Sequence, residues 1–282
     1  MAAPTITVAE HAGVCFGVQR ALDLAYGAVD APVQPVRTLG QLIHNPLVAE
    51  ELLERGIGMA ETVADADAGT LVIRAHGVAP AVIEEAETAG LSIIDATCPF
   101  VKRVHDAADK LVAESYQVII LGESGHPEVE GIRGHASEGA LVIGSAEELS
   151  GAKLGRRVGL VVQTTQTQER LREVVDYLLP RVSEIKVYNT ICAATRERQE
   201  AACELAAQCD AMVVIGGRNS GNTRRLAEIC TAACANTHHI VSADELDAVW
   251  FAGCEHIGVT AGASTPAHHI EHIVAAIKKF TV

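Results

Sequence analysis

The stretch Ile93-Ile94-Asp95-Ala96-Thr97-Cys98-Pro99-Phe100 joins a short apolar run to a cysteine and a proline. Proline suits the first position of a helix, because its missing N–H has no partner there. Apolar residues then recur at helical spacing as far as Val112. The stretch therefore predicts a strand that ends shortly before Cys98 and a helix that begins directly after it. The free N–H groups and the positive dipole end of such a helix favour a thiolate.

The same construction occurs around two other cysteines. The strand-like stretch 6–8 precedes Cys15, the stretch 185–191 precedes Cys192, and a helical pattern follows each cysteine. A polar residue that follows an apolar–glycine pair lies 29, 28 and 28 residues after the three cysteines; these residues are His44, His126 and Ser220. Such near-equal spacings indicate a repeat. We therefore interpret the chain as three copies of one unit, each opened by a strand–cysteine–helix corner.

Each repeat also has a second polar strand end. The positions that the repeats place at such ends are Cys15, His44 and His76; Cys98, His126 and Thr164; and Cys192, Ser220 and Ser264. Glu128 and Asn222 stand two residues after His126 and Ser220. Ligands of open α/β sheets bind beyond the carboxyl ends of the strands. Three such units around a pseudo-threefold axis would bring these side chains to one centre.

Strand-like runs alternate with amphipathic helical runs along the whole chain, which predicts an α/β fold with mostly parallel sheets. The repeat divides this fold into three similar lobes. We expect the first lobe at residues 1–97, the second at 98–190, and the third, with a C-terminal tail, at 191–282.

Composition narrows the class of protein. The chain has 282 residues, of which 49% are hydrophobic and only 3% aromatic, and its formal net charge is −14. The charge argues against nucleic acid and anionic membranes as partners, and the few aromatic residues argue against base stacking. We find neither a signal-peptide pattern nor an apolar run of membrane-spanning length. We therefore expect a cytoplasmic protein whose eight cysteines do not form a disulfide framework.

Three thiolates from three separate repeats suit a metal centre. Structural zinc sites usually contain close cysteine pairs such as CxxC, which this chain lacks. An iron–sulfur cluster held by three cysteines, with one open iron as a Lewis acid, matches better. The histidine, hydroxyl and amide groups are good donors to phosphate oxygens. Glu128 is the only acid in the set and hence the natural proton donor.

At this point the chain resembles the family of 4-hydroxy-3-methylbut-2-enyl diphosphate reductases over nearly its whole length. The motifs that carry the resemblance occur in the family's order. They are Gly13-Val14-Cys15-Phe16-Gly17-Val18-Gln19-Arg20-Ala21, Gln41-Leu42-Ile43-His44-Asn45-Pro46, Arg74-Ala75-His76-Gly77, Asp95-Ala96-Thr97-Cys98-Pro99, Gly125-His126-Pro127-Glu128-Val129-Glu130-Gly131, Gln163-Thr164-Thr165, Asn219-Ser220-Gly221-Asn222 and Thr260-Ala261-Gly262-Ala263-Ser264.

The resemblance implies a three-lobed fold around one [4Fe–4S] cluster with three cysteine ligands, or a [3Fe–4S] form after loss of the open iron. The implied cluster ligands are Cys15, Cys98 and Cys192. The residues implied to bind the substrate are His44, His76, His126, Thr164, Ser220, Gly221, Asn222 and Ser264. Glu128 and Thr164 are implied to deliver protons, and a ferredoxin or flavodoxin is implied to deliver two electrons.

The resemblance also implies the products, isopentenyl and dimethylallyl diphosphate. One departure is visible, since many relatives carry a second serine where this chain has Gly221. Five other cysteines lie at no repeat corner and are interpreted as packing residues: Cys203, Cys209, Cys230, Cys234 and Cys254. Histidines without a repeated position are interpreted as structural or surface residues: His105, His135, His238, His239, His256, His268, His269 and His272.

Two alternative functions come from other classes. A non-enzymatic sensor or scaffold would hold a labile cluster on the same cysteines, but it would not need a set of phosphate donors. A zinc-dependent hydrolase of a phosphorylated metabolite would give a colourless, oxygen-tolerant protein that contains zinc.

Overall fold

The computed structural model describes residues 3–280. Within this range, twelve strands form three four-stranded sheets, and every strand pairing is parallel. The prediction of an α/β fold with parallel sheets is thereby confirmed. The chain divides into two compact units. Unit 1 holds the described residues of 1–18, 44–46 and 193–282, and unit 2 holds 19–43 and 47–192.

Unit 2 contains the first two sheets, of which the first has the strand order β3-β2-β4-β5. Its elements are β2 (Val36–Leu39), β3 (Gly58–Ala60), β4 (Thr70–Ile73), β5 (Ser92–Asp95), α1 (Phe16–Gly27), α2 (Pro46–Glu54), α3 (Pro80–Thr88) and a 3₁₀ turn, η1 (Ala64–Ala66). The central strand β4 is buried throughout. Its residues Leu71 and Ile73 pack in one core cluster with Ala86 of α3.

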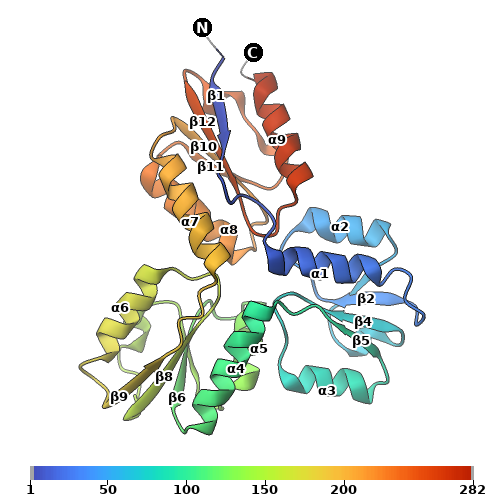
Figure 1. Cartoon of the computed structure of the whole chain (residues 1–282), viewed down its shortest axis with the longest axis vertical. Coiled ribbons are helices and arrows are strands. Elements are labelled where there is room, and N and C mark those ends of the chain that lie inside the picture. The colour runs from blue at the N-terminus through green and yellow to red at the C-terminus, as the bar shows by residue number, and fades with distance from the viewer. Residues whose placement is uncertain (1–2, 281–282) are drawn as a thin grey trace. The chain divides into compact units, whose positions relative to one another are not determined.

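The second sheet of unit 2 has the order β7-β6-β8-β9. Its elements are β6 (Gln117–Leu121), β7 (Leu141–Ile143), β8 (Arg157–Val162), β9 (Glu184–Val187), α4 (Pro99–Ala113), α5 (Pro127–His135), α6 (Gln168–Leu178) and the 3₁₀ turn η2 (Ala146–Leu149). Alternate residues of β6 face opposite sides, as the pleat requires. Ile119 packs with Val174 of α6, whereas Ile120 packs with Leu111 of α4. The sheet is therefore covered by helices on both faces (Figure 1).

Unit 1 contains the third sheet, with the order β1-β12-β10-β11. Its elements are β1 (Thr5–Val8), β10 (Ala211–Ile215), β11 (Thr237–Ile240), β12 (His256–Ala261), α7 (Ala193–Ala206), α8 (Gly221–Ala233), α9 (Ala267–Phe280) and the 3₁₀ turns η3 (Ala243–Glu245) and η4 (Ala248–Phe251). Val213 packs with Ile273 of α9, and Met212 packs with Leu205 of α7 on the other face. The expected lobe boundaries put residues 5–8 in the first lobe, but β1 pairs with β12 in this third sheet.

The three sheets share one register. Leu39, Leu121 and Ile215, the last residues of β2, β6 and β10, pair with Ile73, Val162 and Ala261 of the central strands. His44, His126 and Ser220 each follow five residues after the first set. The repeat that the spacing predicted is thus present in the backbone hydrogen bonding.

Close packing of helices onto the central strands requires glycine at one repeated position. A Cβ on Gly159 of β8 would lie 2.4 Å from Leu111 of α4, and a Cβ on Gly258 of β12 would lie 2.2 Å from Met212. Counted back from Val162 and Ala261, the two glycines occupy the same place. Both let the neighbouring side chains approach the sheet closely.

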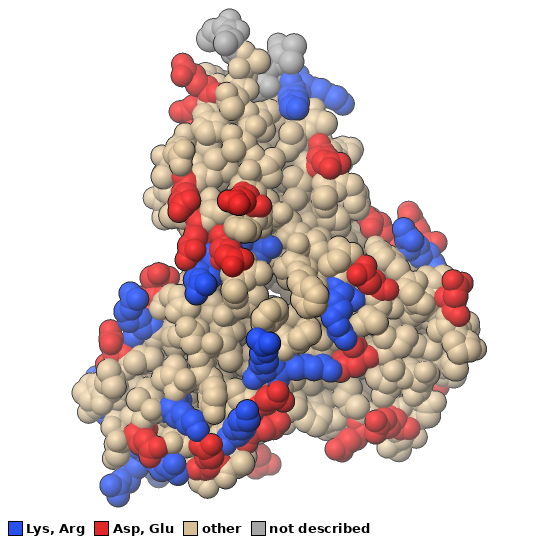
Figure 2. Space-filling model, in the orientation of Figure 1, with Lys and Arg blue, Asp and Glu red and all other residues tan. Residues whose placement is uncertain are grey.

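The surface carries both signs of charge. On the face drawn in Figure 2, acidic side chains lie interspersed with basic ones. Several form exposed ion pairs, such as Arg157 with Glu184 and Arg133 with Glu130. Among the helices of residues 3–280, none combines the length and the apolar character needed to cross a bilayer.

Candidate functional site

All three predicted cysteines lie where a helix begins. Cys98 directly precedes α4, and Cys15 and Cys192 directly precede α1 and α7. Each thiol is half-buried and belongs to no disulfide. The backbone N–H groups of the cysteines make one repeated hydrogen bond to the end of a central strand. The acceptors are the carbonyl oxygens of Ala263 for Cys15 (3.4 Å), Ala75 for Cys98 (3.0 Å) and Thr164 for Cys192 (3.1 Å).

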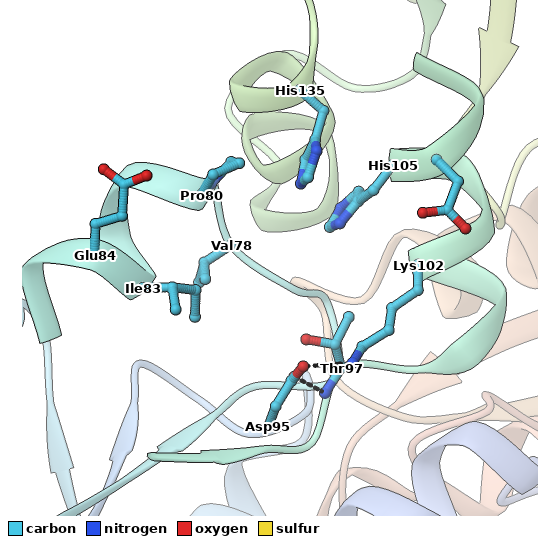
Figure 3. Close-up of a pocket in the computed structure, with 10 residues that line it drawn as sticks. Val78, Pro80, Ile83, Glu84, Asp95, Thr97, Lys102, His105 and His135 are labelled. Carbon is cyan, nitrogen blue, oxygen red and sulfur yellow. Dashed lines mark hydrogen bonds and ion pairs between the residues drawn. The ribbon is translucent and has the colours of Figure 1, made fainter. Parts of the chain in front are cut away.

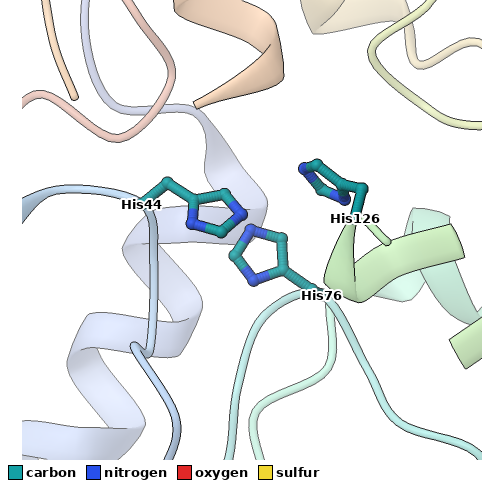
Figure 4. Close-up of side chains that lie close together, drawn as sticks. All are labelled: His44, His76 and His126. Carbon is teal, nitrogen blue, oxygen red and sulfur yellow. The ribbon is translucent and has the colours of Figure 1, made fainter. Parts of the chain in front are cut away.

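In unit 2, two of the predicted histidines lie together. The ring centroids of His76 and His126 are 5.6 Å apart, and the rings meet edge to face (Figure 4). His126 caps the N-terminus of α5, where its Nδ1 accepts a hydrogen bond of 3.1 Å from the N–H of Glu128. In a neutral ring this bond places the proton on Nε2, which can then donate to an anion.

Glu128 is buried in unit 2 with only 2% of its surface exposed. Thr164 donates to it twice, from its N–H to Oε1 at 2.6 Å and from its hydroxyl to Oε2 at 2.9 Å. Burial raises the pKa of the Glu128 carboxyl to about 7, although both bonds from Thr164 oppose the rise. A carboxyl with such a pKa can hold a proton near neutral pH and release it, as a general acid must.

In unit 1, the remaining predicted residues gather at the ends of β10 and β12. Ser220 caps α8 and accepts a 3.3 Å hydrogen bond from the N–H of Thr223. Ser264 donates its hydroxyl to the carbonyl oxygen of His44 at 3.1 Å, and its own carbonyl accepts the amide of Asn45 at 2.7 Å. These two bonds fix the segment that carries His44 against the end of β12.

Asn222 is the clearest open donor in unit 1. It is only 4% exposed, and neither Nδ2 nor Oδ1 has a hydrogen-bond partner among the described atoms. Unsatisfied amide groups in a buried position are costly unless a ligand or water completes them. Asn222 and the buried Gly221 lie in the first turn of α8, where N–H groups point out of the helix and favour an anion.

The register places Thr164 differently from its expected position. We expected Thr164 to correspond to His76 and Ser264, each at the second polar strand end of its repeat. Counted from Ile73, Val162 and Ala261, Thr164 instead corresponds to Ala75 and Ala263. Thr165 is the true counterpart of His76. The sequence could have indicated this ambiguity, because the adjacent threonines Thr164 and Thr165 allow two alignments of the repeat.

A cavity of about 380 Å³ opens in unit 2 beside the Cys98 corner (Figure 3). Lys102 and Asp95 form an ion pair of 2.5 Å on its wall, and Asp95 also accepts the N–H of Thr97 at 2.9 Å. His105, interpreted from sequence as a structural or surface residue, is 6% exposed, and its ring stacks on that of His135 with centroids 4.3 Å apart. The lining of this cavity includes none of the predicted site residues.

Of the other cysteines, Cys230 and Cys234 are buried packing residues, whereas Cys203, also expected to pack, is exposed. Cys230 and Cys234 are buried in one cluster with Leu226 and Ala206. Burial raises the pKa of the Cys230 thiol to about 12 and that of Cys209 to about 11. Thiols of this kind remain protonated and are poor metal ligands.

Comparison with known proteins identifies the family. A family model described as LytB protein matches residues 6–278. The chain belongs to this family. Among curated LytB relatives, the 4-hydroxy-3-methylbut-2-enyl diphosphate reductase of Geotalea uraniireducens is 45% identical and covers 97% of both chains. The reductase of Aquifex aeolicus is 44% identical and covers 97% of this chain and 96% of its own.

Two solved structures are also similar. One is described as (E)-4-hydroxy-3-methyl-but-2-enyl diphosphate reductase, the terminal enzyme of the non-mevalonate pathway. It is 43% identical, with a TM-score of 0.72 and coverage of 97% of this chain and 99% of that chain. The other is the E-1-hydroxy-2-methyl-but-2-enyl-4-diphosphate reductase of Plasmodium falciparum, which is 25% identical, with a TM-score of 0.90 and coverage of 97% and 88%.

Proposed function

We propose that this chain is an oxidoreductase that removes the allylic hydroxyl group of 4-hydroxy-3-methylbut-2-enyl diphosphate. The reaction takes up two electrons and two protons, releases water, and gives isopentenyl diphosphate and dimethylallyl diphosphate. The observation that carries the proposal is the likeness to curated reductases over 97% of the chain. It is supported by three equivalent cysteine corners and by a buried carboxyl with a raised pKa.

The donor set fits one [4Fe–4S] cluster with three protein ligands, Cys15, Cys98 and Cys192. All three thiols are partly accessible, lie outside disulfides and directly precede a helix. When bound, the cluster would supply electrons singly and an open iron for the substrate's oxygen. Loss of that iron would leave a [3Fe–4S] form.

The polar residues divide into a proton donor and a diphosphate site. Glu128 supplies protons to the departing hydroxyl, and Thr164 orients it through the two hydrogen bonds to its carboxyl. His126 donates from Nε2 to the diphosphate, since its Nδ1 is already occupied by an N–H. His44, His76, Ser220, Asn222 and Ser264 complete the anion site, with N–H groups of the first turn of α8 near Gly221.

We also propose an electron donor and a cellular location. A ferredoxin or flavodoxin would pass the two electrons one at a time. A cytoplasmic location would give both partners access to the chain.

Turnover under chemical reduction tests the function without knowledge of the donor. Anaerobic protein, reconstituted with iron and sulfide, is mixed with the substrate and reduced methyl viologen, and the products are separated by chromatography. We expect both diphosphate products from wild type. Glu128→Gln should keep the cluster and substrate binding but lose most of kcat, because proton delivery acts in the transition state. A cluster-loaded wild type that leaves the substrate unchanged would favour the sensor.

A further inference from the structure

Two arginines that no part of the proposed reaction uses reach the backbone of the cysteine corners. Arg198 lies on α7 with only 3% of its surface exposed. Its Nη2 donates to the carbonyl oxygen of Gly13 at 2.7 Å, and its Nη1 donates to that of Ala194 at 2.9 Å. Gly13 stands two residues before Cys15, and Ala194 stands two residues after Cys192. One guanidinium thus hydrogen-bonds both to the segment just before Cys15 and to the first turn of α7, which follows Cys192.

Arg20 makes a similar contact within unit 2. It lies on α1, five residues after Cys15. Its Nη1 donates to the carbonyl oxygen of Thr97 at 3.2 Å, and its Nη2 reaches that of Asp95 at 3.5 Å. Thr97 immediately precedes Cys98, beside the cavity wall drawn in Figure 3. In both cases, an arginine on the helix that follows one cysteine donates a hydrogen bond to a backbone carbonyl just before another cysteine.

The loop between β1 and Cys15 is tightly constrained at Gly13. Gly13 has a φ of +93°, and a Cβ there would lie 2.9 Å from Ile270 and 3.1 Å from the carbonyl oxygen of Thr265. Both the backbone conformation and the close neighbours at position 13 therefore require glycine. The N–H of Gly13 donates to the carbonyl oxygen of Ala261 at 3.2 Å and that of Cys15 donates to Ala263 at 3.4 Å, and both bonds are longer than the bond from Arg198.

A buried guanidinium also brings a fixed charge, because arginine does not lose its proton in proteins. A [4Fe–4S] cluster with three thiolates carries a net negative charge that grows on reduction. Positive charge in a low-dielectric surrounding favours the more negative, reduced state, and hydrogen bonds and net charge are among the factors that set cluster potentials. Outer groups that orient ligands tune a metal site in the same way.

We propose that Arg198 and Arg20 are positioning residues that fix the cysteine corners and raise the reduction potential of the cluster bound there. The inference rests on the proposed function for its cluster part. The positioning part concerns the protein alone and can be measured without a cluster.

The chain offers a matched control for each arginine. Arg196 lies on the same helix as Arg198, but its side chain is 54% exposed and faces Glu200 at 3.8 Å. Arg103 is exposed and follows Cys98 by five residues, with its guanidinium 5.1 Å from the ring of Phe100. Arg196→Gln and Arg103→Gln therefore each remove a positive charge near a cysteine corner without removing a hydrogen bond to the backbone.

The first measurement is hydrogen exchange of the cluster-free protein, followed by mass spectrometry. Arg198→Gln should speed exchange in the segment around Cys15, and Arg20→Gln should do so around Cys98, whereas the two control variants should match wild type. Arg198→Lys keeps the charge but loses the two-pronged donor, so its exchange should also be faster. Exchange equal to that of the controls in both glutamine variants would overturn the positioning role.

The second measurement is a redox titration of the reconstituted protein, followed by electron paramagnetic resonance. At the wild-type midpoint potential, Arg198→Gln should raise the ratio of oxidised to reduced cluster about tenfold. For one electron, this corresponds to a midpoint potential about 59 mV below that of wild type. Arg198→Lys should restore most of this shift, and Arg196→Gln should show little. A glutamine variant with the potential of its control would overturn the electrostatic role. A wild type that binds no cluster would instead refute the proposed function and leave the exchange result standing.

Discussion

Glu128→Gln should change the pH dependence of stability. The carboxyl is buried and accepts two hydrogen bonds from Thr164. Glutamine has the same shape, its oxygen can accept the N–H of Thr164, and the threonine hydroxyl can rotate to accept from the new amide. The substitution therefore removes a titrating group with little change in packing. What it removes at high pH is the cost of a buried negative charge.

The magnitude follows from the pKa. Burial raises the pKa of Glu128 from 4.5 to about 7. The folded state then binds the proton more tightly than the unfolded state, so the carboxyl lowers stability as the pH rises from about 4.5 to about 7. At about 1.4 kcal/mol per pKa unit, the full penalty well above pH 7 is about 3.5 kcal/mol. Glutamine carries no such penalty, so the variant should gain on wild type as the pH rises.

The assay is denaturant unfolding of the cluster-free protein at pH 5 and pH 8. The free energy of unfolding of Glu128→Gln minus that of wild type should rise by about 2.5 kcal/mol between these values, because part of the penalty is already present at pH 5. Glu130→Gln is the control, because Glu130 lies on the same helix with a side chain 43% exposed and paired with Arg133. A difference for Glu128→Gln that is the same at both pH values would refute the reasoning.

Three further predictions concern single side chains. Cys98→Ser should fold with nearly wild-type stability but hold no catalytic cluster, as iron analysis and absorption after reconstitution would show; normal turnover would remove Cys98 from the ligand set. His126→Ala should raise KM at least about tenfold and change kcat less, since it removes a proposed diphosphate donor; a mainly altered cluster spectrum would instead make His126 a ligand. Gly131→Ala places a Cβ 3.2 Å from Nε2 of His105, so it should lower the melting temperature, although alanine usually stabilises a helix by about 1 kcal/mol; Gly27→Ala, with open space around it, is the control.

Much of the fold could be predicted because its signals are local. Apolar runs and glycine punctuation marked β4, β6 and β10, and proline marked the start of α4. The position of β1 could not be predicted in this way. Its pairing with β12 joins residues about 250 apart in the chain, and a four-residue strand carries no signal that selects a partner.

In the candidate site too, features with a local sequence signal could be predicted, whereas features that depend on contacts between distant residues could not. Residues at repeated positions, such as Cys98 and His126, were found because three copies reinforce one another. Arg198 was missed, since its contact with the backbone of Gly13 joins residues that are 185 apart in the chain. The one-residue displacement of Thr164 has a similar cause, because hydrogen-bond register between strands is not written in the order of residues.

The most direct test of the account is the spectroscopy of anaerobically purified protein with and without 4-hydroxy-3-methylbut-2-enyl diphosphate. We expect a brown protein whose electron paramagnetic resonance spectrum changes when the substrate is added, because the proposed cluster would have an open iron for the substrate's hydroxyl. A brown protein with an unchanged spectrum, or a protein that stays colourless after reconstitution with iron and sulfide and contains zinc, would contradict it.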